Sequence, residues 1–219
     1  MGRNKLARFR QNEENANVIQ EGKEIFEKIH GNWNDLQFEN SNPIVVELAC
    51  GRGEFTVGLA REIQDKNFIG VDIKGSRIWK GSTMAIAENL KNAAFLRTQI
   101  EMLDRFFEAA EISELWITFP DPFPRDGDEK RRLTSPRFLE MYKPLLKKGG
   151  MIHFKTDNTG LFDYTLELFQ ERDDIKVHLN THDFYASEWK DDHFGIQTRY
   201  ESIFSAKGEK IKYLKAEFI

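Results

Sequence analysis

Residues 44–53 read IVVELACGRG, and this stretch decides the fold. Its first five residues combine β-branched and apolar side chains with one acid, a composition typical of a short buried strand. The two glycines that follow break the strand, because glycine adopts positive φ freely and lets the backbone approach a ligand closely. A helical pattern then runs from Glu54 to Ile63. The stretch is therefore a strand, a glycine-containing loop and a helix, which is the basic unit of a parallel α/β sheet.

The alternation of strand and helix patterns continues along the chain. Further strands are predicted at residues 67–71, 94–97, 115–119, 151–156, 175–179 and 200–205, and further helices at residues 18–30, 76–89, 135–146 and 162–172. Such alternation predicts a mostly parallel sheet with helices on both faces, and the last strands, which no long helix separates, predict an antiparallel edge strand. We therefore expect one α/β domain with a Rossmann-like, seven-stranded sheet and its ligands at the carboxyl ends of the strands.

The composition excludes several classes of protein. Hydrophobic residues make up 40% of the chain and aromatic residues 12%, which is enough for a full-sized core and too much for a disordered chain. No apolar run approaches the roughly 18 residues of a membrane span, and residues 1–10 carry no secretory signal. The single cysteine, Cys50, permits no internal disulfide and no cysteine-based zinc site, so we expect a cytoplasmic protein without a metal. Residues 191–193, DDH, are interpreted as a solvated turn.

The charges are nearly balanced but unevenly distributed. There are 32 basic and 36 acidic residues, a net charge of −4, which argues against a protein that coats nucleic acid indiscriminately. The first ten residues nevertheless carry four cations and no acid: Arg3, Lys5, Arg8 and Arg10. We expect residues 1–17 to form a flexible basic tail and residues 18–219 to form the domain. Such a cluster can hold a polyanion locally, or it can be an ordinary solvated face.

The first loop indicates a nucleoside ligand without a phosphate. A dinucleotide fingerprint needs a third glycine where this chain has Thr56, and no Gly-Lys-Ser/Thr follows to make a phosphate loop. The order acid-x-small-x-Gly-x-Gly instead resembles motif I of the class I S-adenosylmethionine-dependent methyltransferases. That resemblance implies that Glu47 lies near the cationic methionyl part of the cofactor and that Gly51 and Gly53 border it. A plain structural turn is the alternative, and Cys50 is interpreted as a wall of the pocket.

Asp72 ends the second predicted strand and is a further candidate for cofactor binding. A carboxylate at this position accepts hydrogen bonds from both hydroxyls of an adenosine ribose, as it does in dinucleotide-binding folds. The alternative is a helix cap, since Asp is a favoured N-cap residue. The order of the strands favours the ribose.

The most informative stretch is residues 119–125, FPDPFPR, which stops the fourth predicted strand. Three prolines make a stiff turn that continues neither a strand nor a helix, so they hold Asp121 beyond the sheet edge, where a substrate would meet a cofactor. The cluster Lys130-Arg131-Arg132 follows and could bind phosphates. The alternative is a proline-rich connector with a solvated run of charges.

This stretch resembles the FPDPWPK…KRRL signature of the bacterial tRNA (guanine-N7)-methyltransferases. Phe123 replaces the usual tryptophan and Arg125 the usual lysine. Residues 127–129 read GDE where histidines often precede the basic cluster, which weakens the local positive charge.

Other motifs of the family follow in the right order, so the resemblance extends from residue 47 to residue 201. Thr156-Asp157 matches a Thr-Asp at the end of the fifth strand, and residues 198–201, TRYE, match a late Thr-x-Phe-Glu. The third-strand loop departs from the family, because it reads Gln99-Ile100 in place of an Asp-Ala pair near the adenine.

The resemblance implies a set of ligands and site residues. The implied cofactor is S-adenosylmethionine, and the implied substrate is a guanine of tRNA, at position 46 of the variable loop. The enzyme is expected to be a monomer or homodimer that needs no obligate protein partner and does not bind a membrane. The implied catalytic residue is Asp121. The implied cofactor-binding residues are Glu47, Gly51, Gly53, Asp72, Gln99, Ile100 and Asp121. The implied substrate-binding residues are Arg125, Asp157, Thr198, Arg199, Tyr200 and Glu201, and the implied phosphate contacts are Lys130, Arg131 and Arg132.

The chemistry of guanine N7 requires a fixed carboxylate more than a general base. N7 carries a lone pair and no proton, so its attack on a sulfonium methyl needs alignment and no proton abstraction. Positive charge then spreads into the purine, and N1–H and the exocyclic amine become better donors. A carboxylate that accepts from them binds the transition state more strongly than the ground state. We assign this role to Asp121, with Asp157 and Glu201 as further acceptors.

Three other functions stay open at the level of the sequence. Methyltransferases that act on an exocyclic amine often carry Asn/Asp-Pro-Pro-Tyr/Phe, and residues 121–123, DPF, come close to that motif. A methyltransferase-like scaffold that binds RNA without catalysis is the second, and the intact Glu47, Asp72 and Asp121 argue against it. A nicotinamide oxidoreductase is the third, and Thr56 argues against it.

Overall fold

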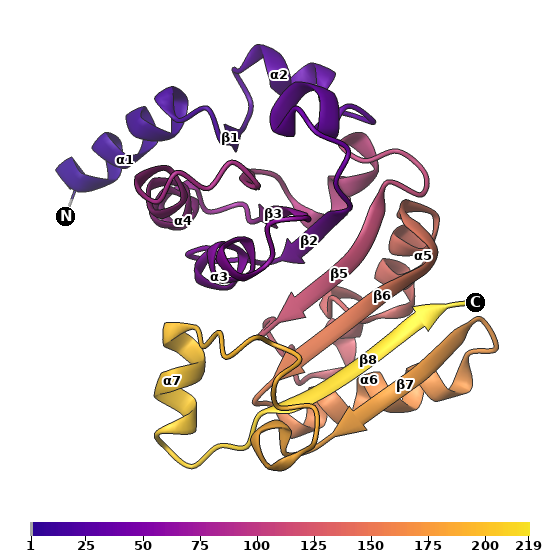
Figure 1. Cartoon of the computed structure of the whole chain (residues 1–219). Coiled ribbons are helices and arrows are strands. Elements are labelled where there is room, and N and C mark those ends of the chain that lie inside the picture. The colour runs from indigo at the N-terminus through magenta and orange to yellow at the C-terminus, as the bar shows by residue number, and fades with distance from the viewer. Residues whose placement is uncertain (1) are drawn as a thin grey trace.

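The computed structural model describes residues 2–219, with side chains from residue 6 onward (Figure 1). In this part of the chain, eight strands form one sheet in the order β1-β4-β3-β2-β5-β6-β8-β7. The strands are β1 (Val18–Ile19), β2 (Ile44–Leu48), β3 (Asn67–Val71), β4 (Ala93–Leu96), β5 (Ile112–Thr118), β6 (Leu146–Thr156), β7 (Ile175–Thr181) and β8 (Lys212–Phe218). All neighbouring pairs are parallel except those of β8, which is antiparallel to both β6 and β7. The expected mostly parallel α/β sheet is confirmed.

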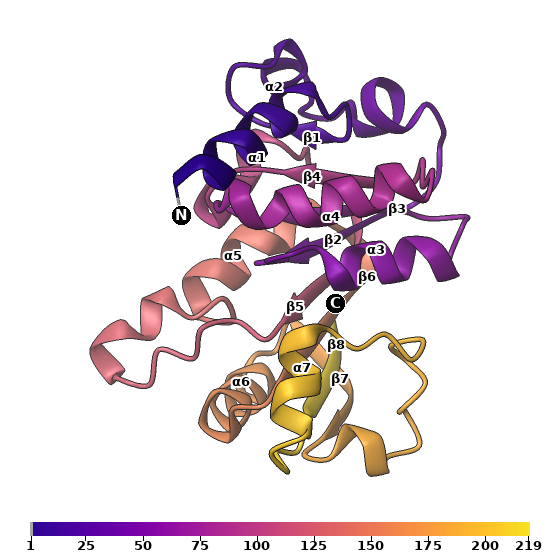
Figure 2. The same cartoon turned by 90° about the vertical axis from the view of Figure 1, so that its left-hand side faces the viewer.

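Helices cover both faces of the sheet (Figures 1 and 2). They are α1 (Gly2–Glu14), α2 (Glu24–Lys28), α3 (Glu54–Glu62), α4 (Gly75–Ala87), α5 (Pro136–Leu145), α6 (Thr159–Glu171) and α7 (Arg199–Ser205). Phe55 of α3 and Ile78 of α4 belong to one buried apolar cluster, and Phe138 of α5 and Phe162 of α6 belong to the other. Among residues 2–219, no helix combines the length and the apolar character that crossing a membrane requires.

The register of the central strands brings the loops of interest to one edge of the sheet. Leu48 of β2 pairs with Val71 of β3 on one side and with Ile117 of β5 on the other, and Val71 pairs in turn with Leu96 of β4. These residues lie at or next to the ends of parallel strands. The loops after β2, β3, β4 and β5 therefore leave the sheet side by side.

The N-terminal region differs from the expected flexible tail and following helix. The structure places residues 2–14 in α1, which packs against α4, and it replaces the helix expected at residues 18–30 by β1 and the short α2. The physical reason is a set of buried amides: Asn12 is fully buried and donates to the Gly75 carbonyl at 2.8 Å, and Asn17 accepts from the Ser82 hydroxyl at 2.6 Å. The side chains of Arg3 and Lys5 lie outside the described part. The domain boundary at residue 18 stays a prediction.

The C-terminal region differs in the number and order of its elements. The strand expected at residues 200–205 is the helix α7, whose start is capped by Thr198: its hydroxyl accepts from the Glu201 backbone N–H at 3.1 Å. The seventh long strand is instead β8, and the two-residue β1 makes the eighth. The antiparallel strand that the sequence predicted at the sheet edge is β8, and it lies one place inward, between β6 and β7.

Candidate active site

Two adjoining cavities lie at the carboxyl ends of the central strands. The larger has a volume of about 510 Å³ and the smaller about 340 Å³, and they share Ala49, Arg77 and Phe119 as lining residues. The larger cavity brings together five residues predicted from the sequence: Asp72, Gln99, Ile100, Asp121 and Arg131. The smaller brings together five more: Glu47, Gly51, Thr198, Arg199 and Tyr200. Residues from five separate loops thus converge on one hollow.

The glycine loop takes the conformation that its sequence requires. Ala49, Gly51 and Gly53 have φ values of 56°, 56° and 68°. A Cβ at Gly53 would lie 2.4 Å from the Phe95 ring, so a side chain there would force the loop off the sheet. Gly53 lines neither cavity and acts by letting the loop pack, whereas Gly51 lines the smaller cavity, as does Cys50, the expected pocket wall.

Asp72 holds the glycine loop and faces the larger cavity at the same time. One carboxylate oxygen accepts from the Gly51 N–H at 3.0 Å, and the other accepts from the Lys74 N–H at 2.7 Å, at the start of α4. Each carboxylate oxygen has a second lone pair for a ligand hydroxyl. The N-cap residue of α4 is Lys74, so Asp72 holds the loop before the helix rather than capping it, and its remaining lone pairs stay available to a ligand.

Glu47 is a buried carboxylate at the junction of β2 and β5. It is 3% exposed and accepts hydrogen bonds from the Thr56 N–H at 2.9 Å, from the Thr56 hydroxyl, and from the Thr118 hydroxyl at 2.7 Å. Burial raises the pKa of Glu47 from 4.5 to about 7, against the opposing effect of these hydrogen bonds. The site therefore carries a carboxyl group that titrates near neutrality and that a cationic ligand would ionise.

We expect the stability of the protein to fall as Glu47 ionises. The folded-state pKa of about 7 lies above the ordinary 4.5, so the folded chain binds more protons than the unfolded chain between these values. The contribution of Glu47 to the free energy of unfolding is fully present below about pH 4.5. It is lost as the pH rises through 7, and the loss is on the order of 3 kcal/mol. Denaturant unfolding of wild type and Glu47→Gln at pH 5 and pH 8 measures this, and the variant should lose less stability. Glu24→Gln, on the exposed α2, is the control and should follow the wild type.

The proline loop carries Asp121 on a strained backbone. Phe119 and Phe123 have φ values of 50° and 42°, in the left-handed region that bulky residues rarely adopt. Asp121 is exposed and lines the larger cavity. The Phe119 ring lies 5.3 Å from the Tyr200 ring, which joins this loop to α7. Residues 120–124 form neither a strand nor a helix, as the three prolines predicted, and the carboxylate is at the cavity where a ligand would lie.

The basic cluster after the proline loop is divided between the interior and the surface. Arg132 is only 9% exposed, donates to the Phe123 carbonyl at 3.1 Å and lies over the Tyr164 ring at 4.3 Å. Arg131 lies 4.2 Å over the Phe123 ring and pairs with Asp128 at 3.1 Å. Arg132 supports the proline loop from inside, so its placement does not fit the predicted phosphate contact. Lys130 and Arg125 are exposed.

Asp157 lies at the end of β6 beside α7. Its carboxylate accepts from the Tyr200 hydroxyl at 3.3 and 3.4 Å, and its backbone carbonyl accepts from the Lys212 ammonium at 2.7 Å. The start of α7 is held from the other side by Glu54, whose carboxylate accepts from the Arg199 N–H at 2.7 Å. Asp157 and Tyr200 are therefore in contact with each other; Tyr200 lines the smaller cavity, whereas Asp157 lines neither cavity.

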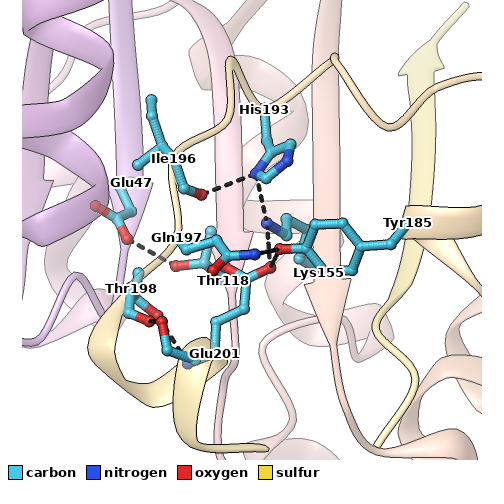
Figure 3. A network of polar contacts seen from close by, with 10 residues as sticks. Glu47, Thr118, Lys155, Tyr185, His193, Ile196, Gln197, Thr198 and Glu201 are labelled. Carbon is cyan, nitrogen blue, oxygen red and sulfur yellow. Dashed lines mark hydrogen bonds and ion pairs between the residues drawn. The ribbon is translucent and has the colours of Figure 1, made fainter. Parts of the chain in front are cut away.

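Glu201 does not face either cavity. Its side chain is fully buried and pairs with the equally buried ammonium of Lys155 on β6 at 2.8 Å (Figure 3). The Tyr185 hydroxyl donates to the same carboxylate at 2.7 Å, and burial lowers the pKa of Lys155. His193, expected in a solvated turn, is 2% exposed, and its Nδ1 lies 3.4 Å from the lysine nitrogen.

This buried group of Lys155, Tyr185, His193 and Glu201 was not predicted as a unit. The sequence signal was a lysine inside the otherwise apolar strand MIHFKT, since a buried lysine needs a partner of opposite charge. The ion pair fixes the start of α7, and with it Thr198, Arg199 and Tyr200, against the sheet. The buried group positions the wall of the smaller cavity, and its four members line neither of the two cavities.

The chain is similar in sequence to methyltransferases. A family model described as "Putative methyltransferase" matches residues 41–214. Proteins named tRNA (guanine-N(7)-)-methyltransferase are 46% identical in Cytophaga hutchinsonii, over 100% of this chain and 99% of the relative, and 45% identical in Christiangramia forsetii, over 97% of each. The relative in Bacteroides fragilis is 44% identical over 98% of this chain and 86% of its own length.

Solved structures share the fold at low identity. The 16S rRNA methyltransferase KamB superposes with a TM-score of 0.62 and 15% identity, over 91% of this chain and 95% of that one. An rRNA methylase from Streptococcus thermophilus gives a TM-score of 0.55 and 14% identity, over 89% and 92%. The eight-stranded sheet is thus that of the class I methyltransferase fold.

Proposed function

Since the chain belongs to the family of the tRNA (guanine-N(7)-)-methyltransferases, we propose that it transfers a methyl group from S-adenosylmethionine to N7 of a guanine in tRNA, at position 46 of the variable loop. The observation that supports this most is the place of Asp121. A strained proline loop holds this carboxylate at the same cavity as Asp72 and Gln99, so a substrate base and a cofactor nucleoside would meet there.

The residues of the two cavities fit S-adenosylmethionine. In the larger cavity, the free lone pairs of Asp72 suit ribose hydroxyls, and Gln99 and Ile100 line the place for the adenine. In the smaller cavity, Glu47 supplies a carboxyl group for the cationic methionyl part, and Gly51 lets the backbone approach it. The bound cofactor supplies an electrophilic methyl group on a positively charged sulfur.

The protein contributes alignment and charge stabilisation. Guanine N7 has a lone pair and no proton to remove, so no residue has to act as a base before methyl transfer. Asp121 accepts hydrogen bonds from guanine N1–H and the exocyclic amine, which become better donors as positive charge enters the purine. Adenine presents an acceptor at N1, so the same carboxylate repels it and selects guanine.

The remaining substrate contacts lie on α7 and at the end of β6. Thr198, Arg199 and Tyr200 line the smaller cavity, and Asp157 contacts Tyr200, which supports the proposal that all four border the guanine. Glu201 acts indirectly, because its buried ion pair with Lys155 holds α7 in position. Arg125 and Lys130 are exposed beside the proline loop and are proposed contacts for the tRNA backbone.

We propose that the enzyme works in the cytoplasm, as a monomer or homodimer without an obligate protein partner. A single chain assembles both cavities from its own loops, which supports a site that needs no second protein. Light scattering of the purified protein, with and without tRNA, measures the mass of the species.

The decisive experiment identifies the product. The purified protein is incubated with unmodified tRNA and S-adenosylmethionine labelled in the methyl group, and the tRNA is then reduced and treated with aniline. Only N7-methylguanosine makes the chain labile, so cleavage at position 46 is the expected result. A label in an aniline-stable nucleoside would exclude N7 methylation, and a label on an exocyclic nitrogen of that nucleoside would show an exocyclic-amine methyltransferase. Binding of tRNA without any label would show a scaffold.

A further inference from the structure

A third hollow adjoins the smaller cavity and lies between α1, α4 and the glycine loop. It has a volume of about 190 Å³ and is lined by Arg8, Arg52, Ser76, Arg77, Trp79 and Lys80. Four of these six residues are cations and none is an acid. In a chain with a net charge of −4, such a group of cations is a distinct basic surface. We call it the α1–α4 basic pocket.

The cations of this pocket are free to bind an anion. Within residues 6–219, whose side chains are described, no ion pair involves Arg8, Arg52, Arg77 or Lys80. The chain uses other cations for its internal pairs. An unpaired group of this kind is typical of a site for phosphate.

The pocket is built by packing between two helices. The Arg8 guanidinium lies 4.7 Å over the Trp79 ring, which orients it and leaves its N–H groups free. The Trp79 indole donates to Gln11, and the buried Asn12 donates to the Gly75 carbonyl, so α1 is tied to α4 along two turns. A Cβ at Gly75 would lie 2.8 Å from the Phe9 ring, so this close approach depends on the glycine.

The pocket is continuous with the proposed active site. Arg52 and Arg77 line both the α1–α4 basic pocket and the smaller cavity, whereas Arg8 and Lys80 line the basic pocket and neither active-site cavity. A polyanion that reaches the active site with one base therefore has its own backbone close to these cations.

We infer that the α1–α4 basic pocket binds backbone phosphate of the tRNA next to the target guanine. The inference rests on the proposed function and adds a second contact surface, formed by α1, α4 and Arg52 of the glycine loop, to the proposed contacts at Arg125 and Lys130. It also gives α1 a role, because docking this helix on α4 brings Arg8 to Arg52, Arg77 and Lys80.

The test compares tRNA affinity at several salt concentrations for the wild type and the double variant Arg8→Gln/Lys80→Gln. Each lost phosphate contact weakens the dependence of log K on log salt by roughly 0.7–0.9, so the slope should become shallower by about 1.5. The affinity for unmodified tRNA at about 0.1 M salt should fall by about 10- to 100-fold. Affinity for S-adenosylmethionine should stay within about two-fold, since neither residue lines an active-site cavity.

Two further variants make the result specific. Lys147→Gln/Lys148→Gln removes two exposed cations at the start of β6, whereas the active site lies at the carboxyl ends of the strands. This variant should leave the tRNA affinity and its salt dependence unchanged. Arg8→Lys/Lys80→Arg keeps both charges and should retain the wild-type slope. If the first double variant does not fold, the single variant Lys80→Gln provides the test. Its plot of log K against log salt should have a slope that is shallower by about 0.8.

A wild-type slope and affinity in Arg8→Gln/Lys80→Gln would overturn the inference, even if the protein methylates tRNA as proposed. An equal loss in the Lys147 and Lys148 variant would also overturn it, because the effect would then be one of net charge alone. Failure of the proposed function is recognised separately, since the wild type would then yield no N7-methylguanosine.

Discussion

Replacing Asp121 by asparagine should reduce kcat/KM for tRNA methylation by about 100- to 1,000-fold. The substitution keeps the size of the side chain and removes the negative charge that meets the developing charge of the purine. Asparagine also brings an amide donor toward guanine N1–H and the exocyclic amine, which are donors themselves. Methyl transfer from labelled cofactor to unmodified tRNA, at saturating cofactor, measures the effect.

A neighbouring carboxylate provides the matched control for this variant. Asp126 is exposed on the same connection and lines neither cavity, so Asp126→Asn should keep activity within about two-fold. Calorimetric titration with S-adenosylmethionine separates a loss of chemistry from a loss of cofactor. Activity of Asp121→Asn within a few-fold of wild type would remove Asp121 from the mechanism.

Replacing Lys155 by methionine should destabilise the protein by about 3–5 kcal/mol. The variant keeps the apolar stem of the side chain but leaves the fully buried Glu201 without the cation that lies 2.8 Å away. A buried carboxylate that loses its partner cannot recover hydration, so most of the cost stays with the folded state. The free energy of unfolding from denaturant titration measures it.

The pairing of Lys155 with Glu201 predicts how two further variants behave. Lys155→Met/Glu201→Gln removes both charges and should lose less stability than Lys155→Met alone, so the double-mutant cycle gives a favourable coupling. Lys143→Met removes the cation of the exposed pair with Asp174 and should cost at most about 1 kcal/mol. A Lys155→Met variant as stable as Lys143→Met would show that the buried pair does not hold α7.

The sequence predicted the central sheet well because each strand there is a short apolar run between loop signals. The strand at Asn67–Val71 has the predicted bounds, and α3 differs from its expected range by one residue. The ends of the chain were wrong where local pattern and tertiary packing disagree. Residues 200–205, YESIFS, have the aromatic and β-branched content of a strand, but Thr198 caps a helix and Glu201 is drawn inward by Lys155. A threonine followed three residues later by glutamate was the signal for that helix.

The candidate site was predictable where one loop carries the whole signal. Glu47 lies within a strand that could be located, Asp72 and Asp121 each follow one, and the parallel register then brings all three to the two cavities. Arg132 and Glu201 could not be placed in this way, since a charged residue in a motif does not show which way it points. Their partners, Tyr164 and Lys155, lie 32 and 46 residues away in the sequence, and only the folded chain brings them close.

The position of β8 between β6 and β7 also affects how the chain is made. A ribosome completes β6 and β7 before residues 212–218 emerge, so both strands wait with a hydrogen-bonding edge that has no partner. During that interval the nascent protein exposes two edges that could pair with another chain, and chaperone protection matters most there. Insertion of β8 closes both of these edges at once, so this half of the sheet can complete its folding only after residues 212–218 have emerged.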